Sequence, residues 1–176
     1  RGDCGWCGGT RKDLATADLE SAEACPLCLG TGTSIACGGD LGLADRADIC
    51  GAVGLGAVLV EETKDDPFQL LALASTSTST VQLGTSVAMA FPRSPTVTAM
   101  SAWSLQKLSG GRFLLGLGTQ VRAHIQRRYG VEWHAPAPWM RDYVNAMRAV
   151  WRCWQTGTPL EFESDHYRLD VMVPLF

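Results

Sequence analysis

The 176-residue sequence is 46% hydrophobic and 19% charged, which provides a sizeable apolar core and excludes the disordered class of proteins. The net charge is −3, whereas nucleic-acid-binding proteins usually have a strongly basic surface, so we expect no nucleic-acid partner. No apolar run reaches membrane-spanning length and no signal-peptide pattern opens the sequence, so we expect a cytoplasmic protein without a membrane partner.

Residues 1–32 contain four of the seven cysteines. Cys4, Cys7, Cys25 and Cys28 form a C-x2-C-x17-C-x2-C pattern, a spacing typical of a tetrahedral zinc site. Disulfides are an alternative, which a cytoplasmic setting disfavours. Another alternative is that the segment is not native to the protein and is translated from an upstream frame. The spacing predicts a separate Cys-rich segment that binds one zinc.

The next residues predict alternating strands and helices. Residues 34–37 predict a short strand, and residues 41–53 predict a helix with a small-residue face that packs closely on a sheet. The run GAVLVEE at residues 56–62 predicts the second strand, and residues 68–74 predict the second helix. The tract STSTST, residues 75–80, predicts a solvated turn that leads into the following strand.

A second pair of strands flanks a well-marked helix. The run from Val81 to Met89 is apolar and β-branched, and it ends in small residues as a buried parallel strand does. Ser94 as N-cap and Pro95 at the first helical position predict the start of a helix, and Gly110-Gly111 predicts its end. The run FLLGLGT then predicts a buried strand.

The clearest helix comes later, between Pro138 and Gly157. Its apolar residues recur at helical spacing, and we interpret its Met and Trp stripe as core packing. We interpret His134 and His166 as structural or exposed residues. The remaining cysteines fit as small buried apolar residues, and these are Cys37, Cys50 and Cys153.

This order predicts right-handed parallel crossovers, in either an α/β barrel or a doubly wound sheet. The strand ends at residues 61–62, 86–89 and 118–120 would then share one edge, where ligands bind in both folds. A complete eight-stranded barrel needs about 250 residues. Because the sequence begins at Arg1 and stops in an apolar run, we expect an incomplete chain with about half of such a barrel.

Two charged segments each allow two interpretations. The acidic residues that follow residue 60 form either a solvated loop or a proton-handling group. These residues are Glu61, Glu62, Asp65 and Asp66. The segment VRAHIQRRYG forms either a solvated helix face or a surface that attracts an anionic ligand, because arginine suits carboxylates and phosphates.

From about residue 33 to residue 176 the chain resembles the bacterial luciferase-like superfamily, most of all its branch that uses the deazaflavin coenzyme F-420. The matching segments are VLVEETKDDPFQLLALA, LGTSVAMAFPRSP, LSGGRFLLGLGTQVRAHIQRRYG and MRDYVNAMRAVWRCWQTGTPLEFESDHYRL. The resemblance implies domains at 1–32 and 33–176. The fold would be α/β, a partial TIM (β/α)8 barrel of about the first four βα units behind the Cys-rich segment.

The resemblance also implies site residues. Glu62 and Asp66 match the place of an acid near the reactive edge of the cofactor ring. The matching bond for a non-prolyl cis peptide beneath the ring is Ser86–Val87. The implied cofactor contacts are Ser86, Val87, Ala88, Gly118, Thr119 and Gln120.

Three functional hypotheses follow. The first is hydride transfer between F-420 and a small-molecule substrate, with this portion alone inactive and a homo-oligomer left open. The second is an FMN-dependent monooxygenase on the same fold. The third is a non-catalytic zinc-binding interaction module, because CGWCGGT and CPLCLGTG resemble the CxxCxGxG repeats of the DnaJ cysteine-rich domain, with Arg11 in place of a glycine.

Overall fold

The computed structural model describes residues 56–173, and the chain divides into two compact units. The strand unit contains residues 56–86 and 105–115, and the helical unit contains residues 87–104 and 116–173. The predicted zinc segment, the strand at residues 34–37 and the helix at residues 41–53 lie outside the described residues.

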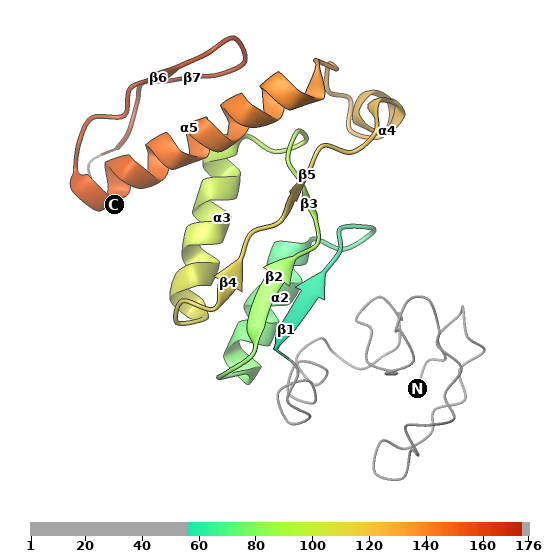
Figure 1. Ribbon diagram of the computed structural model, residues 1–176, viewed down its shortest axis with the longest axis vertical. Coiled ribbons are helices and arrows are strands. Elements are labelled where there is room, and N and C mark those ends of the chain that lie inside the picture. The colour runs from blue at the N-terminus through green and yellow to red at the C-terminus, as the bar shows by residue number, and fades with distance from the viewer. Residues whose placement is uncertain (1–55, 174–176) are drawn as a thin grey trace. The chain divides into compact units, whose positions relative to one another are not determined.

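A parallel sheet forms the core of the strand unit (Figure 1). Its strands are β1 (Ala57–Val60), β2 (Gln82–Thr85) and β4 (Phe113–Leu114), in the order β1-β2-β4. Val58 pairs with Leu83, which in turn pairs with Phe113, and all three side chains are buried. The parallel pairing that the alternation of strands and helices predicts is therefore confirmed for these strands.

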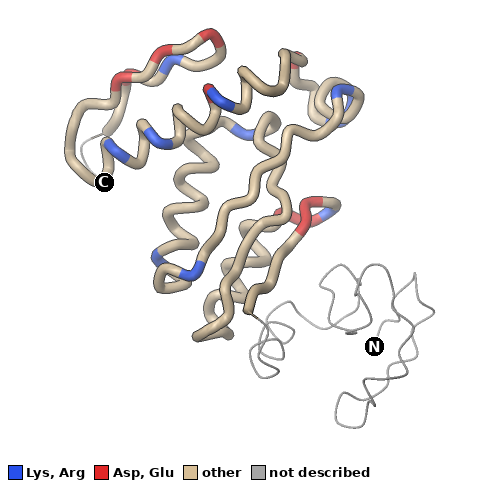
Figure 2. The backbone as a smooth tube through the Cα atoms, viewed as in Figure 1, with Lys and Arg blue, Asp and Glu red and all other residues tan. Residues whose placement is uncertain are grey.

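Helix α2 (Pro67–Ser77) covers one face of this sheet. It begins after an acidic loop, where red segments gather in Figure 2. Leu71 is fully buried, and the rings of Phe68 and Phe113 lie 6.4 Å apart between their centroids. On the opposite face of β1, Leu59 is 51% exposed, so this sheet is covered by the described residues on one side only.

The expectation of a turn over the whole STSTST tract is wrong for its first half, because Ser75, Thr76 and Ser77 form the last turn of α2. Their hydroxyl groups donate to backbone carbonyls three or four residues earlier, and the Ser75 Oγ to Ala72 O distance is 2.7 Å. Hydroxyl side chains that bond back in this way are satisfied inside a helix. Composition alone therefore misplaced the end of α2.

Arg112 joins separate segments of the strand unit. Its Nη1 donates to Val81 O at 2.6 Å, its Nη2 to Thr78 O at 2.8 Å and its Nε to Ser109 O at 2.7 Å. These carbonyls lie in the connection between α2 and β2 and in the turn after α3 (Pro95–Leu108). We call this set of contacts the Arg112 clamp. It supplies hydrogen-bond donors to carbonyl oxygens that lie outside the strands.

Helix α3 begins and ends as the sequence predicts. The Ser94 hydroxyl accepts from Val97 N at 3.2 Å, which is an N-cap contact, and Pro95 is the first helical residue. Gly110 and Gly111 follow the helix with φ values of +63° and +89°. Glycine adopts this left-handed region at little cost, so the pair ends the helix.

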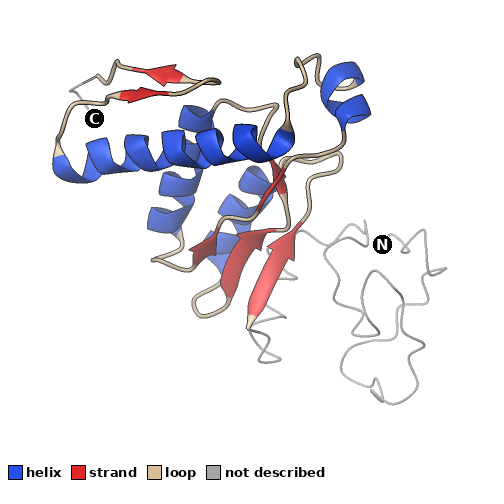
Figure 3. Ribbon diagram, turned by 45° about the horizontal axis from the view of Figure 1, so that its top comes forward, coloured by secondary structure: helices blue, strands red, loops and turns tan. Residues whose placement is uncertain are grey.

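The helical unit contains a short parallel pair, two further helices and a hairpin (Figure 3). The parallel strands are β3 (Ala88–Met89) and β5 (Leu117–Gly118), and the helices are α4 (Arg122–Arg127) and α5 (Pro136–Thr156). Strands β6 (Phe162–Glu163) and β7 (Arg168–Leu169) form the antiparallel hairpin beside α5.

Helix α5 buries part of the stripe that the sequence predicts. Of the predicted stripe, Tyr143, Met147 and Val150 are buried, which confirms them as core. The other members, Met140, Val144, Trp151 and Trp154, are half-buried, so the stripe is core only in part. The helix ends where Gly157 adopts φ +71°. None of the helices in residues 56–173 combines the length and the apolar character needed to cross a membrane.

Candidate functional site

Two predicted site residues follow neighbouring strands of the strand unit. Glu62 comes two residues after β1, and Ser86 comes directly after β2. Ser86 N donates to Val60 O at 2.7 Å, so Ser86 lies beside the end of β1. Glu62 is half-buried and Ser86 is exposed. The structure therefore brings these two strand ends to the same edge of the sheet, as parallel pairing requires.

Asp66 has a structural role in the same unit. Its Oδ1 accepts from Phe68 N at 2.8 Å, and Asp66 is the N-cap of α2. A carboxylate at this position satisfies a backbone donor and interacts favourably with the positive end of the helix. The Asp66 carboxylate therefore stabilises the start of α2.

The other predicted contacts lie in the helical unit, where β3 and β5 bring them together. Ala88 pairs with Leu117, and Ala90 N donates to Gly118 O at 2.9 Å. A Cβ atom added to Gly118 would lie 2.5 Å from Val87 Cγ2, closer than real Cβ atoms approach. Glycine at position 118 is therefore what allows the two strand ends to pack this closely.

Gln120 is the one non-glycine residue in the described part of the chain with a positive φ, at +58°. Its Oε1 accepts from Val121 N at 2.9 Å, which supports the local backbone. A non-glycine residue in this region costs about 1–3 kcal/mol, and such residues gather at ligand sites. Gly118, Thr119 and Gln120 are half-exposed, so small side chains and accessible backbone occur together here, which suits close approach of a planar ring.

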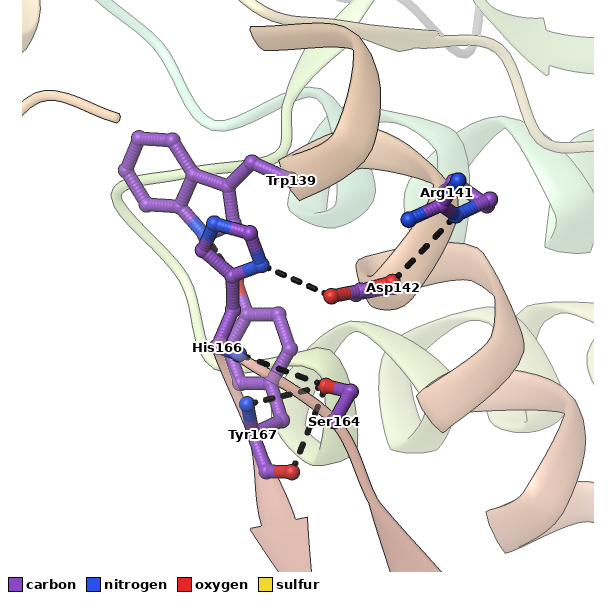
Figure 4. Close-up of polar contacts among 6 residues, drawn as sticks. All are labelled: Trp139, Arg141, Asp142, Ser164, His166 and Tyr167. Atoms are coloured by element: carbon purple, nitrogen blue, oxygen red, sulfur yellow. Dashed lines mark hydrogen bonds and ion pairs between the residues drawn. The ribbon is translucent and has the colours of Figure 1, made fainter. Parts of the chain in front are cut away.

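The structure also shows a polar pair that sequence reasoning missed, between α5 and the hairpin (Figure 4). His166 Nδ1 lies 2.7 Å from Asp142 Oδ2. The Asp142 side chain is 9% exposed and that of His166 is 12% exposed. Arg141 Nε lies 3.5 Å from the other Asp142 oxygen. Of the two alternatives that we expected, His166 fits the structural one, because its ring is hydrogen-bonded to Asp142, and His134 is exposed.

Two pKa shifts accompany this pair. The hydrogen bond with His166 lowers the pKa of Asp142 and outweighs the burial that would raise it, and Arg141 contributes to the lowering. Burial raises the pKa of Tyr167, against the opposing hydrogen bond from Trp139, whose Nε1 donates to the Tyr167 hydroxyl at 2.7 Å. Asp142 is therefore ionised and Tyr167 is neutral at physiological pH.

The basic residues near α4 face the solvent, as one of the two interpretations predicts. Arg122, His124, Arg127 and Arg128 are exposed. Within residues 56–173 no three or more His, Cys, Asp or Glu residues are grouped to hold a metal ion. The four cysteines of the predicted zinc site lie outside the described residues, so that site stays a prediction.

Comparison with known proteins gives both sequence relatives and structural neighbours. An uncharacterized protein from Mycobacterium tuberculosis is 48% identical over 115 residues, which are 65% of this chain and 34% of the relative. A second protein from that organism, provisionally named a coenzyme F420-dependent oxidoreductase, is 38% identical over 106 residues, or 60% of this chain and 30% of the relative. The matched part of the chain thus spans about a third of the length of these relatives.

Two solved structures have the same fold. The coenzyme F420-dependent tetrahydromethanopterin reductase from Methanopyrus kandleri aligns with a TM-score of 0.59 and 21% identity, over 74% of this chain and 42% of its own. The oxygenating constituent of 3,6-diketocamphane monooxygenase from Pseudomonas putida, in complex with FMN, aligns with a TM-score of 0.65 and 17% identity, over 76% of this chain and 39% of its own.

These alignments identify the fold as part of a luciferase-like α/β barrel over about three quarters of the chain. The profile of the luciferase-like monooxygenase family matches residues 42–175. Since that match covers well over half of the sequence, the chain belongs to the luciferase-like monooxygenase family.

Proposed function

We propose that this chain is part of an oxidoreductase that transfers hydride between coenzyme F-420 and a small organic substrate. The observation that carries the proposal is the 38% identity to the relative provisionally named an F420-dependent oxidoreductase. The strand ends support it, because small residues and accessible backbone gather where ligands bind in barrels of this kind.

In this proposal the cofactor supplies the hydride chemistry, and the chain supplies position and proton handling. Ser86 and Val87 lie between β2 and β3, Ala88 is the first residue of β3, Gly118 is the last residue of β5, and Thr119 and Gln120 follow it. Gly118, Thr119 and Gln120 contact the cofactor through backbone groups. Glu62 holds or delivers a proton, whereas Asp66 acts mainly through its cap on α2. A cis peptide at Ser86–Val87 remains a prediction.

An FMN-dependent monooxygenase is the second candidate. The similarity to the 3,6-diketocamphane monooxygenase, whose structure contains FMN, favours this candidate. At 17% identity that similarity concerns the fold alone, so the closer sequence match favours F-420. A zinc-binding module at residues 1–32 is compatible with either cofactor, and measurement of zinc bound per chain tests it separately.

Equilibrium titration with F-420 and with FMN, followed by cofactor fluorescence, tests the proposal. We would titrate the chain itself and also the chain joined to the remaining two thirds of the 38% identical relative. Saturable binding of F-420 in preference to FMN is the expected result. Preference for FMN would favour the monooxygenase, and binding of neither by the completed barrel would overturn both.

A pair of variants locates the site. Thr119→Trp places a bulky ring at a half-exposed strand end and should abolish binding. Thr158→Trp makes the same change at an exposed position after α5 and should leave the affinity unchanged. Equal effects of the two substitutions would contradict the placement of the cofactor at the strand ends.

A further inference from the structure

The helical unit has an open depression of about 330 Å³ that the predicted strand-end residues do not line. Its floor is apolar and rigid, because the rings of Phe91 and Trp139 stack with their centroids 3.6 Å apart at an angle of 10°. The polar residues that line it come from the loops before α3 and α5 and from the β6–β7 hairpin. These residues are Arg93, Ser94, His134, Asp165, His166 and Tyr167.

His166 is the best-oriented polar group of the depression. Its Nδ1 is bound to Asp142, and Figure 4 shows its other ring nitrogen turned away from that carboxylate. Among residues 56–173 no hydrogen-bond partner contacts this second nitrogen, Nε2. Because Asp142 is an ionised acceptor, Nδ1 carries a proton. Nε2 is therefore the atom of His166 that a ligand can meet.

Donors outnumber acceptors around His166. The Arg93 guanidinium is anchored through Nη1, which donates to Met89 O at 3.1 Å. The Ser94 hydroxyl accepts from Val97 N and still has its own proton to donate. The His134 ring lies 5.3 Å from that of His166 between centroids, so two imidazoles meet at one side. Asp165 is the one exposed carboxylate that lines the depression.

We propose that this depression binds an oxyanion, the phosphate or carboxylate group of a small ligand, with His166 Nε2 donating to one of its oxygens. A ring whose Nδ1 donates to Asp142 and whose Nε2 donates to an oxyanion is the imidazolium, and charge-assisted hydrogen bonds to oxyanions are the strong ones. The site lies within the helical unit and does not rest on the proposed cofactor.

The charged groups around His166 come from α5 and from the hairpin. Asp142 on α5 holds Nδ1, and Asp165 and Tyr167 are the neighbours of His166 in the hairpin. Arg141 lies on the other side of the Asp142 carboxylate, 3.5 Å from its second oxygen (Figure 4). The imidazolium attracts an oxyanion, whereas the exposed Asp165 carboxylate repels it.

The three histidines of the sequence give an internal control, because His124 lies on α4 and does not line the depression. We would label the histidine ring nitrogens of the full chain with ¹⁵N and titrate inorganic phosphate at pH 6 and constant ionic strength, following the ring signals by NMR. Saturable shifts of His134 and His166 without His124 are expected. Equal, unsaturated shifts of all three, or no shift at all, would overturn the proposal. Titration with acetate then distinguishes a carboxylate from a phosphate ligand.

Two isosteric substitutions should act in opposite directions. Asp142→Asn removes the charge behind His166 and should raise the dissociation constant for phosphate about tenfold. Asp165→Asn removes an exposed repelling charge and should lower it about twofold. If both carboxylates have a purely structural role, phosphate binding should weaken in both variants or in neither, and that result would contradict the proposal. Asp165→Asn tests the proposal even if Asp142→Asn folds poorly.

Discussion

Arg112 in the strand unit and Asp142 in the helical unit both join distant segments, but they do so through different partners. Arg112 donates to backbone carbonyls of Thr78, Val81 and Ser109. Asp142 contacts side chains, namely those of Arg141 and His166. Each residue makes at least one contact that spans many residues of sequence: 31 for Arg112 and Val81, and 24 for Asp142 and His166.

The difference in partners distinguishes a structural role from a role in ligand binding. Arginine stays protonated at every physiological pH, and the backbone carbonyls that it contacts do not titrate, so the Arg112 clamp stabilises the fold. An aspartate and a histidine both titrate, and their pair leaves one imidazole nitrogen for a ligand. Polar residues that join segments are therefore distinguished by their partners rather than by their burial.

Loss of the Arg112 clamp should have the largest effect on stability. Arg112→Met retains the apolar part of the side chain but leaves the carbonyls of Thr78 and Val81 without their donor. We expect a loss of about 3 kcal/mol in the free energy of unfolding, measured by urea denaturation. Arg112→Lys keeps the charge but not the planar fork, so it should recover only part of the loss. Full recovery by lysine would show that charge alone matters.

Asp142→Asn should have a smaller effect at pH 7. The amide can still accept a hydrogen bond from His166, but the charge assistance is lost, so we expect a loss of about 1–2 kcal/mol. Thermal unfolding followed by circular dichroism is the measurement. A loss as large as that in Arg112→Met would contradict the distinction between a structural role for Arg112 and a ligand-binding role for Asp142.

Tyr167→Phe should cost about 1 kcal/mol, because it removes the acceptor of Trp139 Nε1 while leaving the ring in place. Urea denaturation at pH 7 and at pH 9 measures it. The Tyr167 hydroxyl has a raised pKa and stays neutral at both pH values, so the loss should be the same at both. A loss that differs between them would indicate that the hydroxyl titrates in this range.

The smallest effect concerns the end of α2. At exposed Thr76, alanine should exceed glycine in the free energy of unfolding by about 0.5–1 kcal/mol, because the residue is helical. Equal stability of Thr76→Ala and Thr76→Gly, compared by urea denaturation, would indicate that Thr76 lies in a turn, as the composition of the tract suggests.

Local patterns predicted most of the elements. The Ser94-Pro95 start and the Gly110-Gly111 end of α3 are visible in the sequence, and so is the buried stripe of α5. The STSTST tract misled because serine and threonine favour turns on average, yet here their hydroxyls bond to carbonyls of the preceding turn. A composition rule cannot distinguish the two environments.

The site was only partly predictable. The strand ends followed from the alternation of strands and helices, and Gly118, which pairs with Met89, has no room for a side chain beside Val87. Asp142 is a polar residue on the buried face of α5, and nothing local connects it with His166. The Arg112 clamp is equally hidden, because most of the partners of Arg112 are backbone oxygens that any residue would supply, with the Thr78 hydroxyl as a side-chain acceptor.

The pH dependence of unfolding tests the central claim, that the Asp142 carboxylate of this pair titrates whereas the Arg112 clamp does not. The folded protein holds the pKa of Asp142 below its ordinary value of 3.8, so its contribution is complete above that value and is lost as pH falls through the lowered pKa. We predict that the deficit of Asp142→Asn relative to the unsubstituted chain shrinks as the pH falls below about 4. The deficit of Arg112→Met should not change over the same range. A constant deficit in Asp142→Asn down to the lowest pH at which the protein folds would contradict the account.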